Sequence, residues 1–229
     1  MLVVSNIDLT TNLPVINPSK FLESSVKDST ININNDYRYL KTGYYVSLHA
    51  EILGNQVIPS SENIIDAYRT PILLLRASKA GIPTMPYLVT GSVKQIISEF
   101  SFPVVVFAVN PFSHEGFKIA ENRSALYRAV KSLGMNYKFA VCAQPLDGEM
   151  ISFKSIFGRC GLEDVRDISE NVYNIFKIPI CKLHVQRIGK DVYLCGLQPL
   201  AKEKILPADL KIISEKILQL SKNGENLVG

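Results

Sequence analysis

The chain has 229 residues, of which 47% are hydrophobic and 20% are charged. This composition is typical of a folded globular protein and excludes a disordered one. The formal net charge is +4 and the 25 basic residues are scattered along the sequence, so no concentrated basic stripe indicates a nucleic-acid partner.

Membrane and metal sites are also not indicated. The longest apolar run, residues 102–109, is far shorter than the about 20 residues that a membrane-spanning helix needs. The N-terminus has neither the basic flank nor the cleavage site of a signal peptide, which favours a cytoplasmic protein with no membrane partner. The four cysteines form no CxxC pair, so we expect buried structural thiols and no metal site.

The N-terminal region contains two short strand candidates. Residues 2–4 read as a buried strand, and residues 57–58, just before Pro59, read as another. Residues 30–36 (TININND) are interpreted as too polar for a core strand. We therefore expect a loop that leads into the helix that follows.

A helix is expected from Tyr44 until Gly54, because Gly43 breaks the chain before it and a glycine commonly ends a helix. Its period predicts an apolar stripe that would pack on the core, made of Tyr45, Leu48 and Ile52. A second face of the same helix carries three polar or aromatic residues, Tyr44, Ser47 and Glu51.

The middle block, residues 68–147, predicts the order α-β-α-β-β-α-β, an α/β arrangement. The strand at residues 102–109 is apolar on both faces and is therefore expected to be buried. Asn122 or Ser124 can cap the helix that Gly134 closes. The predicted elements are residues 72–80, 83–90, 92–100, 102–109, 117–120, 124–133 and 137–144.

The C-terminal region predicts a strand at residues 150–157, a helix at 164–176 and a β-hairpin at 181–197 that turns at residues 189–191. His184 lies between two apolar residues of the alternating first hairpin strand, so we expect it on the exposed polar face. Pro207 fits the first turn of a closing helix, whose apolar stripe is Leu210, Ile213, Ile217 and Leu220.

The tyrosine-rich segment at residues 36–55 is the strongest candidate for a ligand site. Arg38 lies just upstream of the helix and is suited to a planar carboxylate, which tyrosine hydroxyls can orient. Arg159 is a candidate second cation, with a surface arginine as the alternative. The other proposed ligand-binding residues are Tyr37, Tyr39, Tyr44, Ser47 and Glu51. The alternative is that the tyrosines pack the core and Arg38 pairs with an acid.

No catalytic residue is assigned. His114 and Glu115 have the chemistry of an acid/base pair, but neither a nucleophile nor a metal set accompanies them, so a solvated loop is favoured. Lys118 is expected to be an ordinary surface lysine.

The motifs of residues 36–59 resemble the domain that precedes the catalytic module of RimK-like ATP-grasp ligases. That family has a Tyr-Arg-Tyr element followed by Gly-Tyr-Tyr-Val-Ser-Leu and Ala-Glu, and this chain has them at residues 37–39, 43–48 and 50–51. A weaker match, residues 157–159 with the following hairpin, falls in the expected order. Gln198 stands at its end where the family has an arginine.

The middle block is similar to the small lid subdomain of ATP-grasp enzymes, through LLLRASKAGIPTMPYLVT and FPVVV. The resemblance implies a phosphate-binding lysine at the end of the strand, but this chain has Phe107 and Ala108 there. The loop PFSHEG holds one glycine where active enzymes are glycine-rich, and the magnesium-binding core has no counterpart.

The resemblance implies a mixed α/β fold, with residues 1–67 and 148–229 as one discontinuous domain and residues 68–147 as a lid-like insertion. It favours a non-catalytic binding or accessory protein that recognises an amino-acid or peptide-like carboxylate, or a separately encoded ATP-grasp ligase, with no cofactor. The alternative is a reduced ATP-grasp enzyme that binds ATP and magnesium and ligates a carboxylate to an amine, with a homodimer completing its site.

Overall fold

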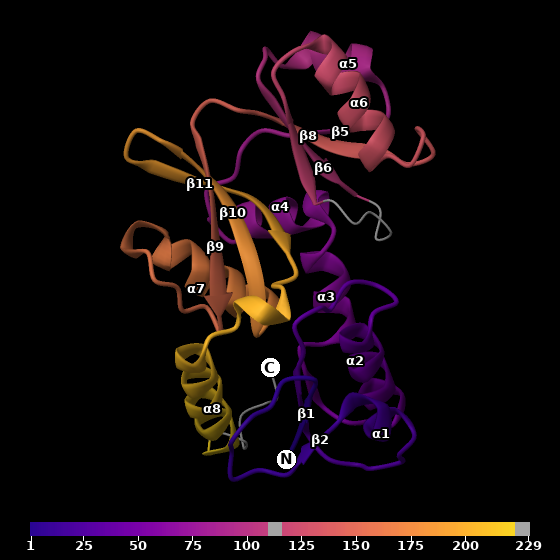
Figure 1. Ribbon diagram of the computed structural model, residues 1–229, viewed down its shortest axis with the longest axis vertical. Coiled ribbons are helices and arrows are strands. Elements are labelled where there is room, and N and C mark those ends of the chain that lie inside the picture. Colours follow the sequence, from indigo (N-terminus) through magenta and orange to yellow (C-terminus); the bar gives the residue numbers. More distant parts are fainter. Residues whose placement is uncertain (110–115, 223–229) are drawn as a thin grey trace. The chain divides into compact units, whose positions relative to one another are not determined.

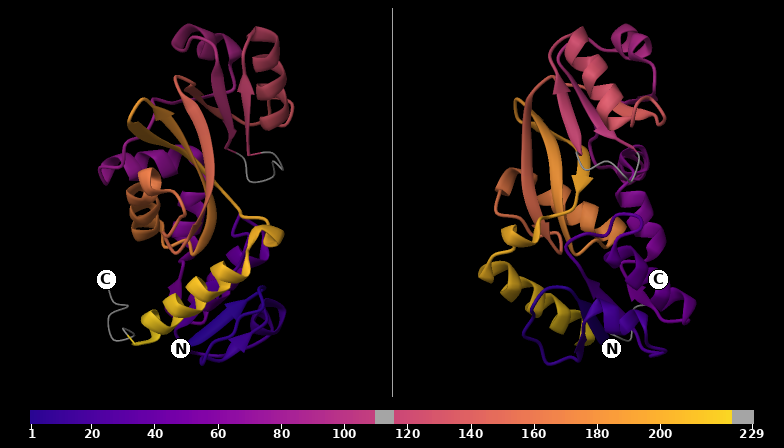
Figure 2. Two further views of the ribbon diagram at one scale, coloured as in Figure 1. Left: turned by 60° about the vertical axis from the view of Figure 1, so that its left-hand side comes forward. Right: turned by 45° about the vertical axis from the view of Figure 1, so that its right-hand side comes forward.

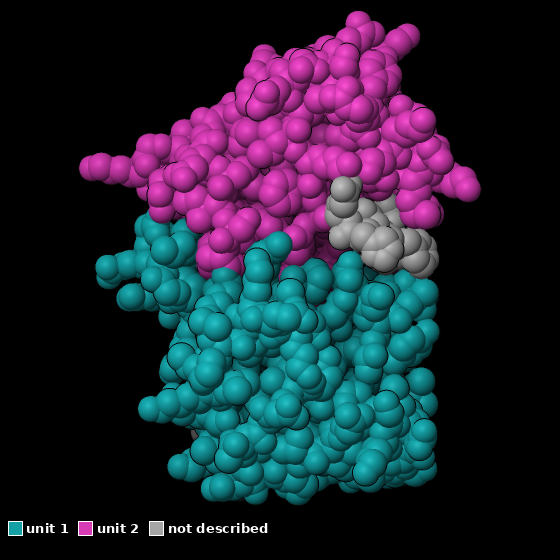
Figure 3. All heavy atoms as spheres, viewed as in Figure 1, with its two compact units in different colours: residues 1–65, 154–182, 199–229 teal, residues 66–153, 183–198 magenta. Residues whose placement is uncertain are grey.

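The computed structural model describes residues 1–109 and 116–222 (Figure 1). These residues form a mixed α/β protein, which confirms the predicted fold class. The chain divides into two compact units (Figure 3). Unit 1 holds residues 1–65, 154–182 and 199–229, and unit 2 holds residues 66–153 and 183–198.

The first boundary between the two units falls after residue 65. Residues 183–198 group with the middle block, so the later boundaries fall within the strands β9 (Glu149–Ile156) and β10 (Ile180–Ile188). The assignment of residues 68–147 to a lid-like insertion stays a prediction.

Unit 1 is built on a parallel four-stranded sheet of order β2-β1-β3-β4. Val3 is in register with Ile31, and both side chains are buried. The strands are β1 (Leu2–Ser5), β2 (Val15–Ile16), β3 (Thr30–Ile33) and β4 (Val57–Ile58). The helices assigned wholly or mainly to this unit are α1 (Pro18–Leu22), α2 (Thr42–Ile52), α3 (Ser61–Ala67), α7 (Arg166–Phe176) and α8 (Pro207–Lys222).

The two faces of this sheet are covered by different helices, because side chains of a strand alternate between its faces. Val3 and Ile31 pack in a cluster with Ile213 and Ile217 of α8, and Figure 2 shows α8 running along the sheet. On the opposite face, Leu2 and Val4 pack with Phe21 of α1 and with Val46 and Ala50 of α2.

The interpretation of residues 30–36 as too polar for a core strand was wrong. Thr30 to Ile33 form β3, and all four residues are buried. Ile31 and Ile33 supply the apolar face. Asn32 is tolerated on the other face because its amide donates to Gly43 O (2.6 Å) and to Ser47 Oγ (2.8 Å) of α2.

The predicted helix is confirmed as α2, but its apolar stripe was assigned to the wrong face. Tyr45 is 42% exposed and Ile52 is 74% exposed. The buried residues are Gly43, Tyr44, Val46, Ser47 and Ala50. Gly43 and Ser47 are small because α2 lies there against Asn32 and the loop after β3, while Val46 and Ala50 pack with apolar residues of β1 and α1.

The predicted hairpin is also confirmed. Strand β10 is followed by β11 (Asp191–Gln198), and these two strands form a sheet with β9 in the order β11-β10-β9. The prediction that His184 is exposed was wrong, because its side chain is fully buried. Its ring lies against Phe117 (ring centroids 4.9 Å apart), and Nδ1 lies 2.7 Å from Ser152 Oγ.

Unit 2 contains a four-stranded sheet of order β5-β8-β6-β7 in which the paired strands are antiparallel. Its elements follow the predicted α-β-α-β-β-α-β order. They are α4 (Thr70–Lys79), β5 (Leu88–Thr90), α5 (Val93–Glu99), β6 (Val104–Ala108), β7 (Phe117–Ala120), α6 (Arg123–Leu133) and β8 (Val141–Pro145).

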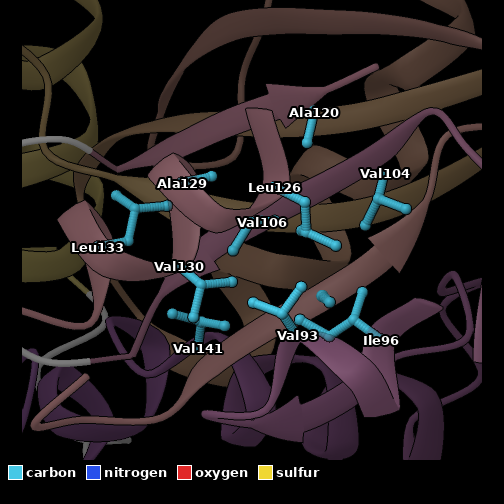
Figure 4. Packing of buried hydrophobic residues seen from close by; sticks show 11 residues of the cluster. Val93, Ile96, Val104, Val106, Ala120, Leu126, Ala129, Val130, Leu133 and Val141 are labelled. Atoms are coloured by element: carbon cyan, nitrogen blue, oxygen red, sulfur yellow. The ribbon is translucent and has the colours of Figure 1, made fainter. Parts of the chain in front are cut away.

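The core of this sheet lies between its strands and the helices α5 and α6 (Figure 4). Leu126, Val130 and Leu133 of α6 point at Val106 and Val141 of the strands. Strand β8 begins at Val141, later than the predicted residue 137, because three residues after α6 adopt a left-handed backbone.

The prediction of buried thiols is confirmed for Cys142, Cys181 and Cys195, while Cys160 is partly exposed. Within residues 1–109 and 116–222, no helix has both the length and the apolar character needed to cross a membrane.

Candidate functional site

The carboxyl ends of β1 and β3 in unit 1 form the first candidate site. The chain leaves β1 toward β2 on one side and leaves β3 through α2 toward β4 on the other side. In open α/β sheets, ligands bind outside the carboxyl ends of the two strands where the order reverses in this way. The topology therefore places a site at Ser5, Asn6 and the residues after Ile33.

Three chain segments meet at this edge through a set of polar contacts. Asn6 Nδ2 donates to Asn35 Oδ1 (2.7 Å), and Asn6 N donates to Ile33 O (3.3 Å). Asn35 Nδ2 donates to Leu200 O (3.2 Å), and Lys202 Nζ donates to Asn6 O (2.9 Å). The loops after both strands are thus fixed to each other and to the segment after residue 199.

A hollow of about 320 Å³ lies beside the end of β1. Its polar groups include the carboxylate of Asp8, the hydroxyl of Thr10 and the amide of Asn17. A carboxylate and a hydroxyl can accept hydrogen bonds from an amine. The residues that line the hollow are Ser5, Ile7, Asp8, Leu9, Thr10, Val15 and Asn17.

A buried polar network fixes the loop after β3. Ser47 Oγ donates to Pro59 O (2.6 Å) and accepts from Asn32. Asn34 Nδ2 donates to Asn32 Oδ1. The hydroxyl of Tyr37 accepts from Asn34 N and donates to Asn32 O, both at 2.9 Å. Burial raises the pKa of Tyr37 far above its ordinary value, so this hydroxyl stays protonated.

Arg38 follows this network directly and forms an ion pair with Asp36. Its Nε lies 3.0 Å from Asp36 Oδ1, and its Nη2 lies 2.7 Å from Asp36 Oδ2. Both side chains are 23% exposed. The exposed Tyr39 packs on the buried Tyr44, with ring centroids 5.1 Å apart. The contacts with Asp36 fix the orientation of the Arg38 guanidinium.

The remaining predicted site residues have partners within unit 1. Glu51 accepts from Ser61 N (2.7 Å) and from Ser61 Oγ, at the start of α3. Arg159 is exposed, and its Nη1 lies 3.7 Å from Oε2 of Glu215 in α8. Tyr37 and Ser47 are fully buried. These four residues therefore have structural contacts, and Arg38 and Tyr39 remain as groups that a ligand can reach.

The residues at the end of β1 were not predicted as site residues. Asn6, Asp8 and Thr10 lie in a polar loop with no motif, and only the strand order indicates that this loop and the loop after β3 share an edge. The available signal was the short buried strand at residues 2–4 followed by a polar loop, which is typical of the first βα unit of a ligand-binding sheet.

The second candidate site is the end of β6 in unit 2, where the lid resemblance implies a lysine. Phe107 occupies this position and is 2% exposed. Its ring centroid lies 5.3 Å from that of Phe117 and 6.3 Å from that of His184. A Cβ on Gly196 of β11 would lie 2.6 Å from the Phe107 ring, so only glycine fits there.

Lys118 of β7 donates from Nζ to Ser132 Oγ (3.1 Å). Among the residues that the structure describes, no cluster of three or more His, Cys, Asp or Glu side chains could hold a metal ion. His114 and Glu115 lie outside the described residues.

The sequence matches the family model described as RimK-like ATPgrasp N-terminal domain over residues 19–216. No curated protein matches the sequence.

Several solved structures share the fold at low sequence identity. The RimK domain ATP-grasp protein from Sphaerobacter thermophilus DSM 20745 matches with a TM-score of 0.66 and 14% identity, over 95% of this chain and 100% of that chain. D-alanine–D-alanine ligase from Bacillus anthracis, complexed with ATP, matches with a TM-score of 0.64 and 14% identity. The match covers 98% of this chain and 99% of that chain. The ATP-grasp ligase PsnB, complexed with a precursor peptide and AMPPNP, matches with a TM-score of 0.62 and 12% identity. The match covers 95% of this chain and 96% of that chain.

Proposed function

The chain belongs to the family of RimK-like ATP-grasp N-terminal domains, and from this premise we propose that it is a non-catalytic binding protein. It recognises an amino-acid-like or peptide-like carboxylate, or a separately encoded ATP-grasp ligase, and it requires no cofactor. The ligand site is the carboxyl edge of the parallel sheet in unit 1.

The observation that carries this proposal is the packing of Phe107. The lid resemblance implies a lysine here, because a fixed cation offsets the charge of nucleotide phosphates. Phe107 supplies no charge, and its ring is buried against Phe117, His184 and the backbone of Gly196. Phosphoryl transfer depends on positioned cations around the transferred group, and an aromatic ring cannot replace one.

Two features of unit 1 support an amino-acid-like ligand. Arg38 is held by Asp36 immediately after β3, and an oriented guanidinium is well suited to a carboxylate. Asp8 and Thr10 line the hollow after β1 and are suited to an amine. Because the carboxyl ends of parallel strands share one edge of a sheet, both groups of the ligand meet complementary partners there.

Calorimetric titration of the whole chain with ATP and magnesium tests the nucleotide part of the proposal. We expect no binding tighter than about 1 mM, which corresponds to about −4 kcal/mol. D-Alanine–D-alanine ligase under the same conditions serves as the positive control. A micromolar dissociation constant for this chain would overturn the proposal.

One observation favours a second function, a reduced ATP-grasp enzyme that uses ATP and magnesium. The similar solved structures include ligases complexed with ATP, with AMPPNP, or with magnesium and ADP. This alternative makes the opposite prediction for the same titration, and a second copy of the chain would have to complete its site.

A further inference from the structure

The helix α6 and the loop after it carry a cluster of exposed basic and aromatic side chains in unit 2. We call it the basic–aromatic surface. Arg128, Lys131 and Lys138 are exposed. Tyr127 is 39% exposed, Met135 40% and Tyr137 47%. Exposed large apolar side chains interleaved with cations mark an interaction surface more often than isolated ones do.

Residues 122–140 carry a formal net charge of +4, with four basic residues and no acidic residue. The rest of the chain has 21 basic and 21 acidic residues, so its formal charges cancel in number. Among the described residues, the ion pairs do not include Arg128, Lys131 or Lys138.

A hollow of about 390 Å³ lies within this surface. Two of its lining residues are cations, Arg128 and Lys131, which lie three residues apart and therefore on one side of α6. The other lining residues are Ser132, Met135 and Asn136. The hollow thus combines positive charge, polar groups and one flexible apolar side chain.

Capping of the helix does not account for these cations. The last carbonyls of α6 already accept from the loop, with Gly134 N on Val130 O (2.9 Å) and Asn136 N on Lys131 O (2.8 Å). Basic side chains near a helix end can satisfy such carbonyls, but here backbone N–H groups do so. The carbonyl end of a helix disfavours an anion, and Arg128 and Lys131 offset that effect in the hollow.

The loop after α6, residues 135–137, has a strained backbone conformation. Met135, Asn136 and Tyr137 have φ angles of 51°, 57° and 62°. A left-handed backbone costs about 1–2 kcal/mol for each non-glycine residue, and such strain persists mainly where function requires it. In this conformation the side chains of Met135 and Tyr137 are both exposed.

We propose that the basic–aromatic surface docks an acidic peptide segment of a partner protein. Carboxylates of the segment pair with Arg128 and Lys131, and an apolar side chain packs on Met135 and Tyr137. Arginine binds carboxylates through paired hydrogen bonds, methionine adapts to varied apolar partners, and tyrosine is enriched at protein interfaces. Four cations on one helix and its loop make a short footprint, whereas nucleic-acid binding follows an extended basic groove. This surface is independent of the ligand site in unit 1.

Fluorescence anisotropy with a labelled ten-residue peptide of glutamates and two leucines tests the docking surface. We expect saturable binding by the whole chain, and none of the peptide in which glutamine replaces every glutamate. The double variant R128A/K131A should weaken binding at least about tenfold, since it removes two charge-assisted contacts. The matched double variant K79A/K94A removes two exposed lysines of α4 and α5 and should change the affinity less than about twofold.

Three results would overturn the proposal. One is the absence of peptide binding by the wild-type chain at about 1 mM peptide. Another is an equal loss of affinity in both double variants, which would indicate a response to net charge alone. The third is tighter binding of a single-stranded DNA oligonucleotide of equal charge, which would make this a nucleic-acid surface. Circular dichroism confirms that each variant is folded.

Discussion

Asn32 lies in the middle of a buried strand, a position at which a polar side chain needs partners. Its amide donates to Gly43 O and Ser47 Oγ, and its own carbonyl oxygens accept from Asn34 and Tyr37. A buried hydrogen-bonded network restricts the groups that it joins to one arrangement. Here it fixes the backbone that leads to Arg38, so Tyr37 and Ser47 have structural contacts beside the candidate site.

Arg38→Ala tests the ligand site at the residue scale. Amino acids and dipeptides are first screened by the shift they cause in the melting temperature, and the one with the largest shift is titrated. We expect Arg38→Ala to weaken its binding by about 1.5–3 kcal/mol, the cost of losing a charge-assisted hydrogen bond. Arg76→Ala is the matched control, because Arg76 forms a similar ion pair with Asp66 (2.7 Å) in unit 2. A lower free energy of unfolding in Arg38→Ala, with unchanged affinity of the folded variant, would assign Arg38 a structural role.

The buried thiols predict how stability depends on pH. Burial raises the pKa of Cys142, Cys181 and Cys195 from 9.0 to about 12. Between pH 9 and 12 the unfolded chain loses these protons and the folded chain keeps them, so raising the pH favours unfolding. The stabilisation is complete below pH 9 and is lost toward pH 12.

Urea unfolding at several pH values between 8 and 10.5 measures this effect. Each buried thiol should contribute a loss of up to about 1.4 kcal/mol per pH unit above pH 9. Cys181→Ala should therefore lose stability less steeply with pH than the wild type, even if it is less stable at pH 8. Equal slopes for the two proteins would contradict this account of Cys181.

At the scale of elements, the first turn of α2 contains a glycine, Gly43, that its surroundings require. A Cβ on Gly43 would lie 2.6 Å from Asp36 O and 3.0 Å from both Asn34 Cβ and Tyr37 Cδ1. The first turn of α2 therefore packs directly on the loop that carries Arg38. This close approach explains why position 43 holds a residue without a side chain.

Gly43→Ala should destabilise the protein by about 1–3 kcal/mol, because an added methyl group in a packed region forces its neighbours to move. The sign is informative, since glycine to alanine in an exposed helix interior normally stabilises by about 1 kcal/mol. Gly161→Ala is the matched control, because a Cβ there meets nothing within 4 Å and should leave stability unchanged or slightly raised. Denaturant unfolding measures the free energy of unfolding of both variants. A higher free energy of unfolding for Gly43→Ala than for the wild type would show that the loop before α2 moves to make room for the methyl group.

Capping residues, turn glycines and hydrophobic periods in the sequence predicted most of the helices and strands. They predicted few of the faces that these elements bury. Asn122, one of the two expected caps, caps α6, and Gly189 lies in the predicted hairpin turn with a φ of 62°. Strand β3 was missed because Asn32 is buried by partners on a helix that follows ten residues later. His184 was misplaced because its strand face is covered by Phe107 and Phe117, which lie far away in the sequence.

At the scale of the whole molecule, the family could be predicted from the sequence, whereas the edge of the sheet that holds the candidate site could not. The motif residues from Tyr37 to Glu51 led to the family that the match over residues 19–216 confirms. The site beside Asn6 and Asp8 depends on the strand order β2-β1-β3-β4, which no local pattern contains. The grouping of residues 183–198 with unit 2 likewise reflects packing between distant segments.

The central claim is that this chain binds without catalysis, and steady-state release of phosphate from ATP tests it most directly. The whole chain is incubated with ATP, magnesium and a panel of amino acids and dipeptides, with D-alanine–D-alanine ligase as the active control. Because Phe107 replaces the cation that the lid resemblance implies, we predict no phosphate release above the protein-free background under any condition. Turnover on the order of 1 per second, typical of the slower enzymes, would contradict the account.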